Sequence, residues 1–267
     1  MILLLDIGNT NTHLGLANGR AVTRQADIPT RGWRDGTAAR QVRKFSGKAT
    51  LQAVAVCSVV PRATAWARRE MQRIFVVPWF ELTAQTARRS LRINYPRPDT
   101  IGPDRLCNAI AASHHYGAPC LAIGFGTAAT FNVVDGSGHF VGGAIAPGLS
   151  LMTGYLHEKT ALLPAITIRP VRRAIGRSTG EAMRSAAVHG YRGLVRELIR
   201  ELKRELGRRR LPVIATGAYA RFIASDLPEI TAVEPLLTLE GLRLACLANL
   251  KLETSDRKPT LRQDESH

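Results

Sequence analysis

An aspartate, a glycine and four short polar residues stand close together in D-I-G-N-T-N-T, residues 6–12 of the chain. Asp6 ends an apolar run and can face a cation, whereas Gly8 lets the backbone approach an anion. The short side chains that follow can donate hydrogen bonds to phosphate oxygens, namely Asn9, Thr10, Asn11 and Thr12. This composition is typical of a phosphate-binding turn, although an ordinary hairpin turn uses the same residue types.

A second stretch with the same order lies near the middle of the chain. Residues 121–134 read L-A-I-G-F-G-T-A-A-T-F-N-V-V, which is an apolar run, a Gly/Thr turn and a β-branched run. The repeat predicts two similar halves that face each other across a cleft. Two such turns around one anionic nucleotide are typical of the acetate and sugar kinase, heat-shock ATPase and actin superfamily. We therefore expect an α/β fold of two ribonuclease-H-like domains facing a central cleft.

Nine short motifs, each rich in Gly, Thr or Pro, extend the pattern along the chain. They are D-I-G-N-T at 6–10, S-V-V-P at 58–61, N-Y-P at 94–96 with G-P-D-R at 102–105, G-T-A at 126–128, G-G-A-I-A-P-G at 142–148, T-A-L-L-P at 160–164, G-R-S-T at 176–179, A-T-G at 215–217 and L-T-L-E-G-L at 237–242. No single motif is specific, but their order and spacing together are. Over almost its whole length the chain resembles the type III pantothenate kinases.

The resemblance implies that the chain uses ATP to phosphorylate pantothenate to 4′-phosphopantothenate, the first step of coenzyme A biosynthesis. Phosphoryl transfer needs neutralised phosphate oxygens, a positioned acceptor and a group that takes the acceptor proton. Asp6 is the candidate Mg²⁺ ligand, because magnesium prefers one or two carboxylates and keeps much of its water. The polar turn after it would bind the phosphates. The resemblance places Thr127, in the facing turn, on the nucleotide and Gly217 near the adenosine.

The acceptor side is expected in the loop of residues 94–104, which is rich in proline and glycine and leads into a helix at Arg105. By residue chemistry alone Asp104 is a good N-cap for that helix, and this structural role would be enough to explain it. The resemblance instead makes Asp104 the catalytic base that takes the proton of the primary hydroxyl of pantothenate. It also places five more residues around this substrate, namely Tyr95, Gly102, Pro103, Arg105 and Thr179.

Three positions depart from the family pattern. Gly124 stands where the family usually carries an aspartate, Asn132 where an aspartate is common, and Ala218 where a second glycine is usual. The aspartate missing at Gly124 is the expected ligand of a monovalent cation, K⁺ or NH₄⁺, whose binding is therefore in doubt. Three outcomes stay open, namely a kinase that works without this ion, a slow kinase, or a paralogue that has lost the reaction. The intact Asp6, Asp104 and Arg105 favour the first two.

Two other classes of function compete with the kinase. One is a catalytically impaired paralogue that acts as a binding or regulatory protein, which the residues at 124 and 218 support. The other is a nucleic-acid-associated protein, which the formal charge of +16 suggests. The arginines are dispersed and the sequence has no recognisable nucleic-acid-binding motif. We therefore expect pantothenate, and not nucleic acid, as the partner.

The elements that must position these residues follow the repeated order of a hairpin, a third strand and helices. Beyond the two hairpins, strands are expected at 21–28, 51–59, 75–77, 139–145 and 212–215, and helices at 31–45, 63–74, 105–112, 191–206 and 236–250. The expected domains are residues 1–117 and 118–250, and a polar tail follows at 251–267. The turn after residue 215 lies at the carboxyl end of a strand, where α/β folds usually bind nucleotides.

Composition is consistent with a soluble enzyme. The chain has 267 residues and 45% hydrophobic content, which is enough to bury a substantial core. Its apolar opening is too short for a secretory signal, and no run reaches the length of a membrane-spanning helix. We expect a cytoplasmic protein without a membrane partner, and the resemblance implies a homodimer. The 4 cysteines lack metal-binding spacing, so we expect reduced thiols in the core.

Overall fold

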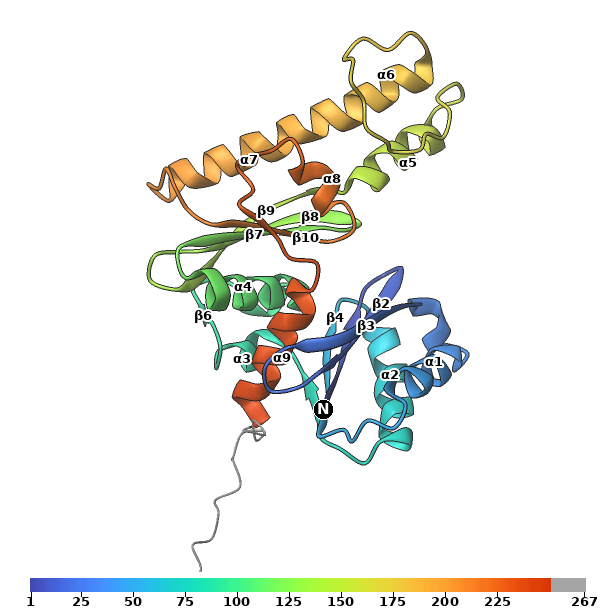
Figure 1. The fold of residues 1–267 in the computed structure, drawn as a ribbon, viewed down its shortest axis with the longest axis vertical. Coiled ribbons are helices and arrows are strands. Elements are labelled where there is room, and N and C mark those ends of the chain that lie inside the picture. Colours follow the sequence, from blue (N-terminus) through green and yellow to red (C-terminus); the bar gives the residue numbers. More distant parts are fainter. Residues whose placement is uncertain (251–267) are drawn as a thin grey trace, which may run out of the picture.

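Two β-sheets organise residues 1–250, the part of the chain that the computed structural model describes (Figure 1). The first sheet has the strand order β3-β2-β1-β4-β5, and the second has the order β11-β10-β7-β8-β9-β6. In each sheet the first strand of a hairpin pairs antiparallel with its hairpin partner and parallel with a strand from later in the chain. The predicted α/β fold with a repeated hairpin is confirmed. The tail predicted at 251–267 lies outside the described residues.

The first sheet carries one aspartate at the end of its central strand. Its strands are β1 (Ile2–Ile7), β2 (Asn11–Ala17), β3 (Val22–Pro29), β4 (Ala53–Ser58) and β5 (Trp79–Glu81), and one of its faces is covered by the 3-10 helix η1 (Thr30–Trp33) and by helices α1 (Thr37–Ser46) and α2 (Pro61–Ile74). Leu3, Leu5 and Ile7 pack on this side. Because side chains alternate along a strand, Asp6 shares the opposite face with Ile2 and Leu4.

The second sheet is covered on both faces. Its strands are β6 (Arg92–Ile93), β7 (Cys120–Phe125), β8 (Ala128–Val134), β9 (His139–Pro147), β10 (Val213–Thr216) and β11 (Ala232–Val233). The helical elements after β9 are α5 (Leu149–Lys159), α6 (Thr179–Ser185), the π-helical turn η3 (Ala186–Gly190), α7 (Tyr191–Glu205) and α8 (Ala220–Ala224). The long helix α7 crosses the outer face, where Tyr191, Val195 and Ile199 are buried (Figure 1).

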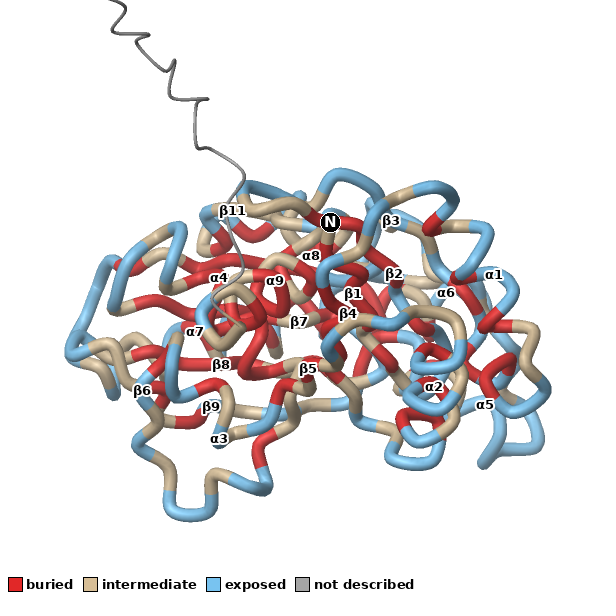
Figure 2. The backbone as a smooth tube through the Cα atoms, turned by 90° about the horizontal axis from the view of Figure 1, so that it is seen from below, coloured by how far each residue is buried: buried red, intermediate tan, exposed pale blue. Residues whose placement is uncertain are grey.

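Helix α4 joins the two halves. The chain passes from β5 through α3 (Ala84–Ala87), β6 and the 3-10 helix η2 (Pro98–Thr100) to α4 (Pro103–Tyr116), and it ends its described part with α9 (Leu237–Leu250). One continuous core contains buried residues of β1, β4, α4, β7 and α9 (Figure 2). β6 pairs with β9 of the second sheet, and α9 returns to pack on α4 and β1. The boundary near residue 117 stays a prediction, and β6 and α9 both cross it.

Two local predictions are wrong. The strand predicted at 75–77 is absent, because the chain there has no neighbouring strand to pair with; Val76 is 100% exposed, and β5 begins at Trp79 opposite Val54. The helix predicted at 31–45 is divided into η1 and α1, because Gly36, with φ +75°, interrupts the helical backbone between them; Asp35 also accepts a hydrogen bond from the backbone N–H of Thr37 there. The prediction of core thiols agrees with the structure, since all four cysteines are buried and free.

Candidate active site

The carboxyl groups of Asp6 and Asp104 lie together although they are distant in sequence. Asp6 is near the carboxyl end of β1, on the face that packs against α4, and Asp104 is in the first turn of α4. Burial raises the pKa of Asp6 to about 6, His13 opposes this rise, and the charge of Asp104 adds to it. Burial also raises the pKa of Asp104, against the opposing effect of Arg105. The site therefore holds two adjacent carboxyl groups that resist ionisation.

Asp104 is not the N-cap of its helix, so this structural alternative is wrong. Helix α4 starts at Pro103, and Gly102 is its N-cap. The side chain of Asp104 instead folds back over Gly102, where an added Cβ would lie 2.6 Å from its Oδ1 atom. A side chain at 102 would displace the carboxylate. The proline at the first helical position suits the start of a helix, because its nitrogen has no hydrogen to satisfy.

The first turn exposes backbone and short polar side chains. The N–H of Gly8 donates to the carbonyl of Asn11 at 3.0 Å, which closes the turn, and Asn9, Thr10 and Asn11 are exposed. Thr30 holds the turn from behind, because its N–H donates to the carbonyl of Thr10 at 3.0 Å and its hydroxyl to that of Gly8 at 2.7 Å. An anion could reach Asn9, Thr10 and Asn11 without displacing these bonds.

Thr12 lies differently from the other predicted phosphate donors. Its side chain is fully buried, its hydroxyl shares a 3.0 Å hydrogen bond with that of Thr30, and it accepts one from the indole N–H of Trp33 at 3.0 Å. These bonds fix the hydroxyl inside the lobe. In this position Thr12 shapes the turn and does not face its exposed side.

The second turn and the turn after β10 lie side by side. Gly217 has φ +96°, and a Cβ there would lie 2.4 Å from the carbonyl oxygen of Phe125, directly before the turn that holds Thr127. The two predicted nucleotide contacts, Thr127 and Gly217, are thus brought together. Ala218 is exposed beside them. A cavity of about 360 Å³, which we name the Tyr219 cavity, opens between α5 and Tyr219, and its lining includes Ser150, Thr153, His157, Ile166 and Tyr219.

Four of the predicted substrate residues lie at the start of α4, and Tyr95 joins them through Arg105. The guanidinium of Arg105 is buried and its Nε donates to Oδ1 of Asn132 at 2.7 Å. It also lies 5.5 Å from the centroid of the Phe140 ring, which Tyr95 meets edge-on at 6.1 Å. Burial lowers the pKa of Arg105, and interaction with Tyr95 opposes this change. A buried guanidinium held by a neutral amide can bind an anionic group strongly.

Neutral polar side chains surround Gly124. A Cβ at Gly124 would lie 3.1 Å from the hydroxyl of Thr130 and 3.2 Å from the amide nitrogen of Asn108. The amide of Asn132 donates to Thr130 at 3.3 Å, and the hydroxyl of Thr238 donates to Asn108 at 2.8 Å. These four hydrogen-bonding side chains form an uncharged cluster beside β7. Sequence reasoning missed Asn108, Thr130 and Thr238. The one available signal was an asparagine within an otherwise apolar helical stretch.

Thr179 is not brought to the other substrate residues. It is exposed at the first position of α6, and α6 continues directly into η3 and α7. Figure 1 shows α6 beyond the end of α7, on the outer side of the second sheet, whereas α4 covers the inner side. Within one chain Thr179 and Asp104 therefore lie on opposite sides of the second sheet.

Comparison with known proteins gives one consistent result at the level of sequence. A family model described as type III pantothenate kinase matches residues 2–201. A type III pantothenate kinase of Methylacidiphilum infernorum is 41% identical over 244 residues, covering 91% of this chain and 87% of that protein. A type III pantothenate kinase of Akkermansia muciniphila is 42% identical over 249 residues, covering 93% of this chain and 99% of that protein.

Comparison with solved structures supports the fold. A Campylobacter jejuni protein assigned to the Baf family superimposes with a TM-score of 0.57 at 15% identity, over 94% of this chain and 100% of that one. The inorganic polyphosphate/ATP-glucomannokinase of Arthrobacter superimposes with a TM-score of 0.50 at 14% identity, over 94% and 99% of the two chains. The fold is that of the ribonuclease-H-like sugar kinases.

Proposed function

The chain belongs to the type III pantothenate kinase family, and we propose that its two hairpin turns and Asp104 carry out the reaction of that family. The reaction transfers a phosphoryl group from ATP to pantothenate and yields 4′-phosphopantothenate, the first step of coenzyme A biosynthesis. The observation that carries the assignment of residues is that Asp6, on β1, meets Asp104, on α4. The same helix also packs against Gly124 of the second hairpin.

Asp104 is the group that takes the proton of the acceptor hydroxyl. A general base works best when its pKa lies nearer to the working pH than that of an ordinary carboxyl group. Burial raises the pKa of Asp104 in this direction. Its place in the first turn of a helix holds it rigidly, and Gly102 leaves room for its carboxylate to swing toward the acceptor.

Asp6 is the proposed Mg²⁺ ligand. Its carboxylate is largely buried and forms no ion pair with any of residues 1–250, so it lacks a compensating cation. Within the same residues no group of three or more His, Cys, Asp or Glu could hold a metal. Mg²⁺ usually binds through one or two carboxylates together with substrate phosphates, so this arrangement fits it. The ion would neutralise charge on the phosphate oxygens.

The nucleotide is proposed to lie between the two turns. Gly8, Asn9, Thr10 and Asn11 contact its phosphates from the first half, and Thr127 does so from the second, while the buried Thr12 supports the first turn. Gly217 leaves the turn after β10 free of a side chain. Tyr219, two residues later, lines the Tyr219 cavity. An aromatic ring with polar neighbours at the edge of a cavity suits a nucleobase, so the adenosine would extend toward Tyr219.

Arg105 and Tyr95 are proposed to hold pantothenate, whose carboxylate matches a guanidinium fork. Asn132 fixes the guanidinium by accepting from its Nε, which leaves the two terminal nitrogens for the substrate. An aspartate at 132 would neutralise Arg105, whereas the asparagine keeps its positive charge available.

A monovalent cation is not proposed as a tightly bound cofactor. The cluster of Asn108, Thr130, Asn132 and Thr238 beside Gly124 carries no negative charge, and Asn132 already accepts a hydrogen bond from the cationic Arg105. K⁺ or NH₄⁺ would find oxygen ligands there but no carboxylate. The kinase is therefore expected to turn over with little dependence on either ion, and a catalytically impaired regulatory protein is not supported by any of the comparisons.

A second copy of the chain is proposed to complete the site. Among residues 1–250, six of the eight exposed large apolar side chains lie between residues 145 and 175, namely Ile145, Leu151, Tyr155, Leu156, Leu162 and Ile175. Such a concentration is typical of a protein interface. Thr179 follows this segment and is remote from Asp104 of its own chain. In a homodimer built on this surface, Thr179 would reach the pantothenate site of the partner.

Two further assignments rest on the family. We propose a cytoplasmic location, where ATP and pantothenate meet. No helix among residues 1–250 combines the length and apolar character needed to cross a bilayer. We also propose domains at residues 1–117 and 118–250, with β6 and α9 exchanged between them. Nucleic acid is not proposed as a partner.

Replacing Asp104 with Asn tests the function. A coupled assay of ADP release, run with and without pantothenate, is expected to show that the wild-type chain requires pantothenate. The variant should fold normally and lose about 10²- to 10⁴-fold in kcat. A near-normal rate would remove Asp104 from the mechanism.

Mixing two variants, each expected to be inactive alone, tests whether Thr179 acts across the dimer interface. A chain with Asp104→Asn and a chain with Thr179→Ala are co-refolded, and the heterodimer then contains one site with both native residues if Thr179 acts across the interface. Partial recovery of activity is expected. No recovery, with dimers present by light scattering, would place Thr179 outside the partner's site.

A further inference from the structure

The loop between α5 and α6 is anchored tightly to α6. The backbone N–H of Arg177 donates to a carboxylate oxygen of Glu181 at 2.7 Å, and the hydroxyl of Ser185 donates to the carbonyl of Ala174 at 2.5 Å. A Cβ at Gly176 would lie 2.3 Å from a backbone nitrogen of α6, so the loop touches the helix directly. The backbone of this part of the loop is therefore held in a defined place.

A cavity of about 430 Å³ opens between this loop and α6, and we name it the arginine cavity. Half of its ten lining residues are arginines, namely Arg169, Arg172, Arg173, Arg177 and Arg184. Glu181 is its one acidic lining residue, and one of its oxygens already accepts from the backbone of Arg177. The cavity is thus strongly positive.

These arginines differ from those of the adjacent α7. Among residues 1–250 none of the five side chains forms an ion pair or a hydrogen bond, whereas the arginines of α7 are paired, as Arg192 with Asp226, Arg196 with Glu229, Arg200 with Glu197 and Arg204 with Glu201. The Nε atom of Arg184 is buried without an acceptor. Buried donors in proteins almost always have a partner, and like charges held together repel. The arginine cavity therefore offers donors that its own side chains leave unpartnered and that an anion could accept from.

We propose that the arginine cavity binds a phosphorylated small molecule through a diphosphate or triphosphate group. Guanidinium groups bind phosphate oxygens in pairs, and five of them exceed the need of a single phosphate. The volume is in the range of small-molecule sites. Pro170, Val171 and Ile175 supply an apolar wall for the carbon skeleton of the ligand. The lining of this cavity includes neither Asp6 nor Asp104, and binding there does not require the kinase reaction. In the homodimer proposed above, Ile175 lies on the interface and Arg177 precedes Thr179, so the cavity would adjoin the partner's pantothenate site.

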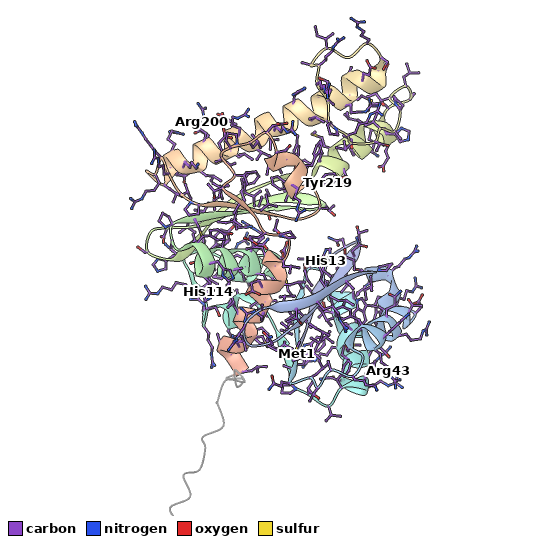
Figure 3. All side chains as sticks on the ribbon, viewed as in Figure 1. Met1, His13, Arg43, His114, Arg200 and Tyr219 are labelled. Atoms are coloured by element: carbon purple, nitrogen blue, oxygen red, sulfur yellow. The ribbon has the colours of Figure 1, made fainter. Side chains whose placement is uncertain are left out.

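The test compares two double variants of the full chain by isothermal titration with inorganic pyrophosphate. Arg172→Gln with Arg173→Gln removes two charges from the cavity. Arg200→Gln with Arg204→Gln removes two charges from the exposed face of α7 (Figure 3). Neither variant touches the two hairpin turns, so any binding there is common to both. Affinity should fall about tenfold or more in the cavity variant and less than about twofold in the α7 variant.

A third variant, Arg184→Gln, removes the guanidinium whose Nε is buried. It should also weaken pyrophosphate binding about tenfold, and its melting temperature and oligomeric state should match the wild type. Equal losses in the cavity and α7 variants would overturn the proposal in favour of a general attraction to a basic surface. No binding of pyrophosphate by the wild type would also overturn it.

A short DNA duplex separates a small ligand from nucleic acid. If the duplex loses affinity only in the cavity variant while pyrophosphate binding is unaffected there, the proposal fails and the cavity serves nucleic acid. Failure of pantothenate turnover with cavity-dependent pyrophosphate binding intact would leave this proposal standing. Normal pantothenate turnover, together with pyrophosphate binding that does not depend on the cavity arginines, would overturn this proposal alone.

Discussion

Strands β1 and β7 hold equivalent places in the two sheets, yet they present different chemistry to α4. Asp6 is the fifth residue of β1 and Gly124 is the fifth residue of β7. Both are on the face of their sheet that packs against α4. Asp6 meets the carboxyl of Asp104, whereas Gly124 meets the amide of Asn108, one helical turn further along. Two equivalent positions have therefore become a charged site and a neutral one.

The difference shows which features of the repeat belong to the scaffold. Both hairpins keep a buried strand and a glycine-containing turn, as expected if the backbone of each approaches the nucleotide in the way we propose. In that proposal the charge needed for Mg²⁺ has to appear only once. A second carboxylate at Gly124 would add a third acidic group beside α4, where burial already raises the pKa of Asp6 and of Asp104 and the charge of Asp104 raises that of Asp6 further.

The largest effect on the reaction rate is expected from removing the charge of Asp6. Asp6→Asn should lower kcat by about 10³-fold, because preorganised charge around the transferred phosphoryl group usually contributes most of the rate enhancement in such reactions. Asp27→Asn is the matched control, since Asp27 is exposed on β3 of the same sheet and pairs with His13. The Asp27→Asn variant should leave kcat almost unchanged. Equal losses of kcat in the two variants would show that Asp6 has no special role.

The same substitution should increase stability, which is the opposite of its effect on activity. The pKa of Asp6 is about 6 in the folded chain against an ordinary value of 3.8. Because the folded state holds its proton more tightly, the free energy of unfolding falls as pH rises from 4 to 6. Above pH 6 the native carboxylate costs up to about 3 kcal/mol, and Asn removes this cost.

Thermal unfolding in the absence of Mg²⁺ measures this effect. Asp6→Asn should melt several degrees above the wild type at pH 8, and the difference should shrink toward pH 4. A difference that does not change with pH would mean that the carboxyl of Asp6 titrates normally.

A carboxylate in the neutral half should have a smaller effect. Gly124→Asp is expected to destabilise the fold by about 1–3 kcal/mol, because its Cβ lies tighter than ordinary contact against Thr130 and Asn108 and the charge is buried. Added K⁺ or NH₄⁺ should recover part of this loss and make kcat depend on the ion. Gly124→Ser is the control with similar crowding and no charge. If the two variants respond alike to K⁺, the position has no part in cation use.

The sequence predicted those features of the two strands that follow from the alternation of side chains along a strand and from the residue types of the turns. Alternation in I-L-L-L-D-I puts Asp6 on one face of its strand, and the Gly/Thr turns follow from local residue types. That this face meets α4 could not be predicted, because it depends on which helix packs there. Asn108 and Thr238 were missed for the same reason, since they become neighbours only when α9 returns to the first half.

Thr12 and Thr179 show two other limits of the sequence. Both belong to motifs that predict substrate contact, and a motif cannot tell an exposed hydroxyl from a buried one. Thr12 is turned inward because Trp33, from η1, offers it an indole N–H. Thr179 lies far from Asp104 because α6 continues the axis of α7 and not that of α4. The strand predicted at 75–77 failed because an apolar run becomes a strand only where a neighbour is available.

The smallest expected effect concerns how each turn is supported. Trp33 braces the first turn through Thr12, whereas the second is held by backbone groups, with the N–H of Gly148 donating to the carbonyl of Thr127 at 2.9 Å. Trp33→Phe keeps most of the buried ring but removes one donor, which should lower the free energy of unfolding by about 1 kcal/mol.

In the same Trp33→Phe variant the KM for ATP should rise a few-fold while kcat changes little, because the turn loosens but Asp6 and Asp104 stay in place. Urea unfolding and ATP saturation curves measure both effects. If kcat falls with an unchanged KM, the indole is acting on the carboxyl pair and the two turns are not braced independently.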